Sequence, residues 1–268
     1  MKSVSIKSAA ILCAGALAAG AVHAEDGPSL GIGVDYSSGD YGSTTTTEIT
    51  SVPLTFKYNS GNWTWKASVP WMRIDGDAGV VPGLGNVGNS NPRGRGRGGN
   101  TAPTGTETGS ASGIGDLRLS ATYAFNTEGA VGVDLTANAK VATADEDKGL
   151  GTGENDYGIA LDLYGDVGGT TVFGGVSHTV LGDSEFIDVD SVWGANFGLS
   201  WAAGEGNSFG VMYDWREAAT ATSDDRSEVT GFYSIKASEA SKWQVYATKG
   251  LSDGSPDWGG GVSFSHAF

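Results

Sequence analysis

Charged side chains recur at alternate positions in several segments, and their spacing predicts a polar lining instead of a catalytic centre. In the segment 114–125, Asp116 and Arg118 alternate with Leu117 and Leu119. Successive side chains of a β-strand point to opposite faces, so the charged residues share one face. In a strand that crosses a bilayer as part of a barrel, a charge facing the middle of the lipid costs about 2–4 kcal/mol. In such a strand the charged face must therefore point into the lumen of the barrel. The predicted lumen residues are Lys57, Lys66, Asp116, Arg118, Asp134, Lys140, Asp162, Asp214, Arg216 and Glu228.

A lining with both signs of charge is compatible with two functions. In a hydrated passage, rings of charge select solutes. In a narrow barrel, the same side chains can close into a network of ion pairs that conducts nothing. Barrels of about twelve strands lie between the small ones that side chains fill and the wide porins. The sequence favours a passive channel for small solutes, and a non-conducting structural or surface-interaction barrel is the alternative.

The sequence offers little for catalysis, cofactors or metals. Beyond the amino-terminal segment its histidines are His178 and His266. Ser177 adjoins His178, but neighbours in a strand point to opposite faces and cannot form a nucleophile–base pair. A barrel hydrolase is therefore the least favoured function. The glycine-rich run 149–153 lacks a βαβ context, and the acids at 145–147 and 154 do not match an EF-hand loop. We predict no catalytic residue, no cofactor and no metal site.

The segment 75–113 is the least regular part of the chain. It holds twelve glycines among 39 residues, together with Arg93, Arg95 and Arg97. Such a composition buries too little apolar surface to order itself, which favours a mobile external loop. A constriction folded into the mouth, with the arginines meeting acidic lining, is a second possibility. A nucleic-acid-binding tract is a third, but the excess of 31 acids over 16 bases disfavours nucleic acid as a partner.

Twelve alternating segments separated by turn residues predict an all-β fold. Roughly 9–11 tilted residues cross a bilayer as a strand, which matches their lengths. Tight connections alternate with longer ones, so we predict a transmembrane antiparallel up-and-down barrel with short periplasmic turns and long extracellular loops. A soluble β-sandwich is the alternative. The predicted strands lie near 29–37, 46–58, 62–74, 114–125, 130–141, 156–166, 169–180, 190–202, 207–217, 227–237, 241–250 and 258–268.

The chain ends on an aromatic residue at the end of an alternating segment. Val262, Phe264, His266 and Phe268 alternate with small residues. The last strand of a closed barrel must pair with the first and present an apolar face to lipid. We therefore predict that 258–268 is the closing strand, and that these four residues are the face through which the barrel-assembly machinery engages the chain.

The first residues predict export. Lys2 and Lys7 precede an apolar run over 9–22, and Ala24 gives a small residue at the expected cleavage site. Residues 25–268 would form the barrel, and they contain no cysteine, which excludes disulfides. The predicted location is the outer membrane, in contact with lipid and lipopolysaccharide, and the oligomeric state stays open.

Several blocks of sequence resemble a known family. They are 51–58 through 73–76, Gly113–Leu117, Thr143–Gly153 and Ser252–Gly261. Together they resemble the outer-membrane β-barrel family labelled for the meta-pathway of phenol degradation, over most of the exported chain. The resemblance implies a transporter-like barrel, with small aromatic or apolar compounds as solutes, and it transfers no catalytic residue. The insert at 83–112 is longer than the family pattern leads us to expect, so the role of this loop stays open.

Overall fold

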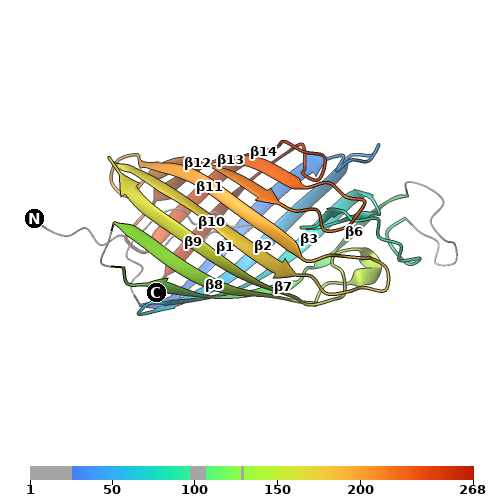
Figure 1. Cartoon of the computed structure of the whole chain (residues 1–268), viewed down its shortest axis with the longest axis horizontal. Coiled ribbons are helices and arrows are strands. Elements are labelled where there is room, and N and C mark those ends of the chain that lie inside the picture. The colour runs from blue at the N-terminus through green and yellow to red at the C-terminus, as the bar shows by residue number, and fades with distance from the viewer. Residues whose placement is uncertain (1–25, 97–106, 128–129) are drawn as a thin grey trace, which may run out of the picture.

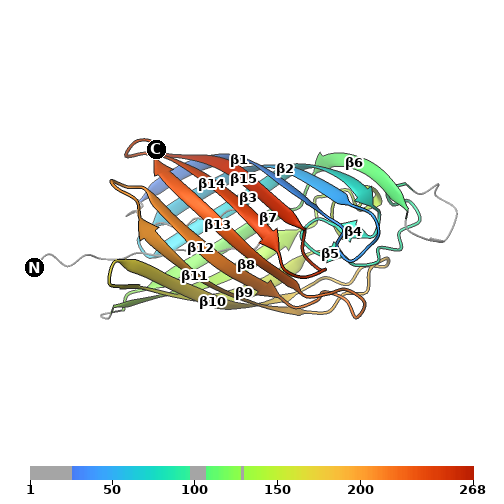
Figure 2. The same cartoon turned by 90° about the horizontal axis from the view of Figure 1, so that it is seen from above.

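The computed structural model describes residues 26–96, 107–127 and 130–268. The predicted signal peptide (residues 1–24) and its cleavage site lie outside these ranges. Long strands alternate with short turns at one end and with long loops at the other (Figures 1 and 2). The C-terminus lies at the end that carries the short turns (Figure 1). This is the arrangement that the connection lengths predicted.

The strands form a closed 12-strand antiparallel barrel. Neighbours in the chain pair with each other, and the ring closes where β1 pairs with β15, from Ser29 opposite Ala267 to Ser38 opposite Trp258. Closure gives each of the twelve barrel strands a partner on both sides, which matters in lipid because no water is present to bind the backbone groups. The barrel strands are β1 (Gly27–Gly39), β2 (Thr47–Ser60), β3 (Trp63–Asp77), β7 (Leu117–Phe125), β8 (Val131–Val141), β9 (Asp156–Val167), β10 (Thr170–Val180), β11 (Val192–Ala202), β12 (Ser208–Arg216), β13 (Arg226–Lys236), β14 (Ser241–Gly250) and β15 (Trp258–Ala267).

One part of the wall extends beyond the rest on the loop side. An additional strand, β6 (Thr108–Ile114), pairs with the outer end of β3 as far as Asp77. The single strand predicted over 114–125 is therefore wrong at its start, because β6 and β7 are separated at Gly115. Pro70 of β3 explains the break: it has no N–H for the ladder, and its carbonyl accepts from Gly115 N at 2.8 Å. The loop between the strands is correspondingly shorter than 75–113.

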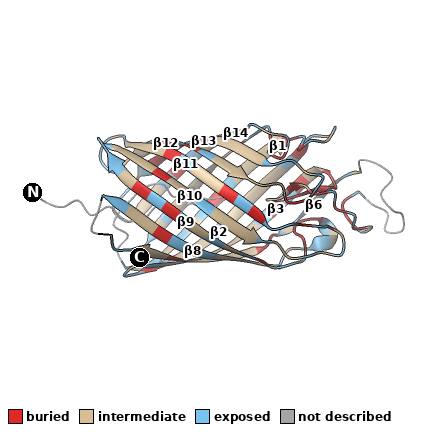
Figure 3. Ribbon diagram, viewed as in Figure 1, coloured by how far each residue is buried: buried red, intermediate tan, exposed pale blue. Residues whose placement is uncertain are grey.

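The outer face of the barrel is apolar. Large hydrophobic side chains are exposed at alternate positions, such as Leu54 on β2 (54%) and Leu163 on β9 (47%), and Figure 3 shows this alternation along the strands. Aromatic residues gather near the strand ends, where Trp63 stacks on Trp65 with 5.4 Å between ring centroids. An apolar band flanked by aromatic girdles is the surface that a barrel presents to lipid. Among the described residues, no helix is long and apolar enough to cross a membrane.

Aromatic side chains also occupy the lumen, where the sequence analysis had placed only polar and charged groups. Tyr164, Phe173, Met212 and Phe232 form a buried cluster. Each ring lies directly opposite a glycine of the neighbouring strand, and a Cβ added there would overlap the ring. The cross-strand pairs are Tyr164 with Gly132, Phe173 with Gly198, and Phe232 with Gly210. Part of the lumen is therefore filled by rings that lie against the wall.

Candidate transport site in the barrel lumen

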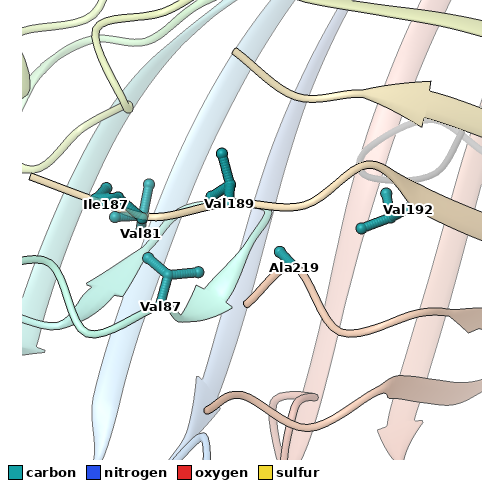
Figure 4. Close-up of a cluster of buried hydrophobic side chains, with 6 residues drawn as sticks. All are labelled: Val81, Val87, Ile187, Val189, Val192 and Ala219. Atoms are coloured by element: carbon teal, nitrogen blue, oxygen red, sulfur yellow. The ribbon is translucent and has the colours of Figure 1, made fainter. Parts of the chain in front are cut away.

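The loop after β3 folds back into the mouth of the barrel. It forms a hairpin from β4 (Val80–Val81) and β5 (Gly85–Asn86), whose tip is Pro82–Leu84. The prediction that this segment lacks the apolar surface to order itself is wrong for 78–96, because neighbouring loops supply the missing contacts. Figure 4 shows the resulting cluster, to which the hairpin segment, the loops after β10 and β12 and the first residue of β11 contribute side chains: Val81, Val87, Ile187, Val189, Val192 and Ala219.

Two arginines of the barrel wall bind the hairpin tip. Arg216 on β12 donates to Gly83 O and, at 3.0 Å, to Leu84 O. Arg226 on β13 donates to Gly83 O at 3.2 Å and forms an ion pair with Glu228. Gly83 has a φ of +84°, in the left-handed region that favours glycine. The tip is thus fixed to the wall by its own carbonyl groups.

Arg95 fixes the base of the hairpin. Its side chain is buried, with 4% of the residue exposed. Nη2 donates to Asp77 O at 2.6 Å and to Val80 O at 2.7 Å, and Nη1 donates to Gly149 O at 2.8 Å. Arg95 therefore joins three backbone segments, one of which belongs to the loop after β8.

Of the other two arginines of this segment, the structure describes only Arg93. Arg93 is exposed and donates to Asp147 Oδ2 at 3.0 Å, at the rim of the barrel. Arg97 lies outside the described residues. The hairpin tip Pro82–Leu84, which the sequence analysis did not single out, contributes residues to the lining of the lumen. A constriction formed by Arg93, Arg95 and Arg97 stays a prediction.

The hairpin tip borders two cavities in the lumen. The larger has a volume of about 250 Å³, and the smaller about 160 Å³. Pro82, Gly83 and Arg118 line both. A single water needs only about 10–15 Å³, so each cavity can hold several waters or a small solute. Other lining residues of the larger cavity include Asp35, Pro53, Pro70, Met212, Asp214, Glu228 and Tyr246.

Lys140 and Asp116 belong to a closed network on the rim. Lys140 Nζ lies 2.8 Å from Asp156 Oδ2 and 3.8 Å from Asp116 Oδ2, and it donates to Thr152 Oγ1 at 3.0 Å. Asp116 Oδ1 also accepts from Ala144 N at 3.0 Å. These contacts bind the loop 142–155 to the barrel wall, so Lys140 and Asp116 stabilise the loop.

Four of the other predicted lumen residues surround the hairpin tip. Arg118 and Arg216 line the smaller cavity, and Asp214 and Glu228 line the larger one. Asp214 on β12 lies directly opposite Glu228 on β13. Carboxylates and guanidinium groups therefore lie around the same hairpin tip, which gives the surrounding space a mixed charge.

Asp134 and Asp162 lie deeper on the wall, directly opposite each other on β8 and β9. They are 0% and 4% exposed. Tyr164 Oη lies 3.4 Å from Asp134 Oδ1, and Asp162 lines the smaller cavity. Lys57 and Lys66 are likewise directly opposite each other, on β2 and β3. All ten predicted lumen residues thus lie on the inward face, but in separate groups.

Several residues that line the two cavities were not predicted. Arg226 and Asp156 stand at the ends of their strands, where assignment to strand or loop was uncertain from the pattern. Tyr246 donates to Asp35 Oδ1 at 2.6 Å inside the lumen. It was not predicted because the alternation of polar and apolar residues does not identify an aromatic residue that faces inward. Tyr41, in the loop after β1, lines the larger cavity. Burial raises its pKa, so its phenol adds no charge there at neutral pH.

The histidines and the loop acids have ordinary structural contacts. His178 lies 4.6 Å, between ring centroids, from Trp193. Asp145 caps the 3-10 helix η1 (Glu146–Lys148) by accepting from Lys148 N. Among the described residues, no group of three or more His, Cys, Asp or Glu side chains could hold a metal ion.

The C-terminal strand contributes to the outer surface. Phe264 packs against Trp243 of β14 at 4.9 Å between ring centroids, and His266 against Phe268 at 5.0 Å. Ser241 Oγ lies 2.9 Å from His266 Nδ1. Val262 is opposite Val34 of β1, at the seam where the barrel closes. Engagement of this strand by an assembly machinery stays a prediction.

The fold is shared with outer-membrane proteins of known structure, although no family model and no curated protein matches the sequence. An outer-membrane channel from Pseudomonas putida F1 superposes with a TM-score of 0.67 at 14% identity, over 91% of this chain and 96% of that one. The KdgM porin superposes with a TM-score of 0.57 at 8% identity, over 90% of this chain and 99% of the porin. The translocator domain of the autotransporter NalP from Neisseria meningitidis superposes with a TM-score of 0.53 at 11% identity, over 92% of this chain and 90% of that domain.

Proposed function

We propose that the protein is an outer-membrane channel for the passive passage of small solutes, constricted by the hairpin tip Pro82–Leu84. One observation carries the proposal: two lumen cavities meet at a tip that hydrogen bonds from Arg216 and Arg226, together with apolar contacts of Val81 and Leu84, fix to the wall. The structural likeness to an outer-membrane channel and a porin supports the location and the general role. The sequence resemblance adds small aromatic or apolar compounds as candidate solutes.

Recordings from refolded protein in planar bilayers test this proposal. We expect small, discrete current steps, because the space around the tip is narrow. Swelling of proteoliposomes in sugars, amino acids and aromatic acids then ranks the solutes. The proposal is rejected if the protein gives neither current steps nor swelling above that of empty liposomes.

A non-conducting barrel is the second candidate, and the filled lumen favours it. Tyr164, Phe173 and Phe232 occupy one wall, and ion pairs occupy the rim. Removing residues 80–86 distinguishes the two functions, because Val87 N donates to Gly79 O at 3.1 Å and the chain can be rejoined there. If the hairpin only narrows a channel, the deletion enlarges an existing conductance. If the intact barrel carries no current and the deletion creates one, the intact protein is a closed barrel.

A further inference from the structure

Four cations follow one another along one wall of the lumen. Lys57 on β2 and Lys66 on β3 are direct cross-strand neighbours. Lys66 is close enough to repel Lys57 and Arg118, and Lys242 on β14 is close enough to repel Lys57. The series, here called the basic stripe, leads from Lys242 near the periplasmic end to Arg118. Arg118 in turn lines both cavities below the hairpin tip.

The centre of the basic stripe is not neutralised by the protein. Among the residues that the structure describes, no carboxylate forms an ion pair with Lys57 or Lys66. Like charges directly opposite each other destabilise a sheet, and partial burial adds to the cost of each charge. The Lys57–Lys66 pair therefore destabilises the folded barrel when no ligand is bound. An anion between the two ammonium groups would relieve their repulsion.

Near the periplasmic end, the wall across the lumen from the basic stripe carries a cluster of apolar side chains. In the ring of strands, five strands separate β3 from β12 on either side, so the two face each other. Met212 of β12 belongs to the buried cluster that includes Phe173 and Phe232. Lys66, Phe173 and Phe232 all lie near the periplasmic ends of their strands. At that level a cationic wall faces an aromatic one.

We propose that this part of the lumen binds and conducts small aromatic carboxylates, with the carboxylate between Lys57 and Lys66 and the ring toward Phe173, Met212 and Phe232. An inorganic anion would neutralise the lysines but leave the aromatic wall unused. A neutral aromatic molecule would leave the two ammonium groups uncompensated. The inference rests on the proposed channel function and narrows its substrate class.

The first test is ion selectivity in planar bilayers, measured as the reversal potential in gradients of potassium chloride and of potassium benzoate. The unchanged protein should pass benzoate in preference to potassium. In the double variant Lys57→Gln, Lys66→Gln this permeability ratio should fall about fivefold, because two charges leave a narrow passage. The control is Lys249→Gln, which removes the same charge from an exposed position outside the lumen. Heat-modifiable gel migration confirms that each variant folds.

A second test measures binding without current. Saturation-transfer NMR of benzoate and of benzyl alcohol is compared for the same three proteins in detergent. We expect a benzoate signal that the double variant loses and the control keeps, with benzyl alcohol binding less. If the unchanged protein conducts but prefers potassium, or if the double variant keeps its selectivity and its benzoate signal, the site is rejected. If no protein conducts, the channel function fails, and the benzoate signal alone decides whether the lysine pair is an anion site.

Discussion

Single glycines shape the lumen as much as the side chains do. Gly132, Gly198 and Gly210 leave open the space that the ring of the cross-strand residue fills. A ring over a glycine buries backbone that would otherwise face the lumen, and it keeps the ring flat against the wall. These glycines are therefore packing positions, and the lumen width depends on them.

Gly132→Ala tests this role. Its Cβ would overlap the Tyr164 ring, so the ring must rotate into the lumen or the strands must part. We expect a loss of about 1–3 kcal/mol in the free energy of unfolding, as for other overpacked sites, measured by urea titration of refolded protein. Gly231→Ala is the matched control, because nothing lies within 4 Å of a Cβ there. Equal stability of the two variants would contradict the packing role.

Arg95 provides a second prediction for a single residue. In Arg95→Met, the carbonyl groups of Asp77, Val80 and Gly149 lose their donor, and each unsatisfied buried acceptor costs about 1–3 kcal/mol. We expect the hairpin to detach while the barrel stays folded, seen as faster amide exchange over 78–96 with unchanged heat-modifiable migration. Arg93→Met should have little effect, since an exposed ion pair contributes about 0–1 kcal/mol. Slow exchange in Arg95→Met would show that the apolar cluster and the hydrogen bonds from Arg216 and Arg226 hold the loop without Arg95.

Among the secondary-structure elements, the barrel strands were predictable from the sequence, whereas the hairpin in the loop after β3 was not. Strand 241–250 was predicted with the bounds that β14 has, because alternation is a local property of the sequence. The hairpin at 80–86 was not predictable, since the residues that order it come from loops distant in sequence. The inward orientation of Lys57 and Lys66 was likewise predictable from the alternation along each strand. Their position directly opposite each other was not, because it depends on the register between β2 and β3.

The docking of the hairpin on the loop 181–191 gives a prediction at this scale. Ile187→Ser with Val189→Ser removes apolar side chains that pack on Val81 and Val87. Burying such a side chain contributes about 1.5–3 kcal/mol, so the double variant should shift the hairpin toward an undocked state. We expect larger current steps than those of the unchanged protein. Leu251→Ser is the control, because Leu251 is 57% exposed on another loop. Unchanged steps in the double variant would mean that Arg216 and Arg226 suffice to hold the tip.

Over the whole molecule, the barrel places its charges and its apolar surface on opposite sides of one wall. The outer band holds hydrophobic side chains that are about half exposed, while the lysines, arginines and acids of the strands between the girdles face inward. This partition is stable only if lipid covers the band, because water would leave a large apolar surface exposed. Depth in the bilayer, rather than local packing, should then determine what an outward charge costs.

A pair of outward substitutions tests that dependence. Leu54 is 54% exposed in the middle of β2, and Val180 is 50% exposed at the extracellular end of β10. An arginine at mid-bilayer depth costs about 2–4 kcal/mol, and one near the interface about 0–1 kcal/mol. Leu54→Arg should therefore unfold from phospholipid vesicles at a clearly lower urea concentration than Val180→Arg, although both sites are equally accessible. In a soluble barrel both substitutions would be nearly neutral, so equal midpoints close to that of the unchanged protein would contradict a lipid-facing band.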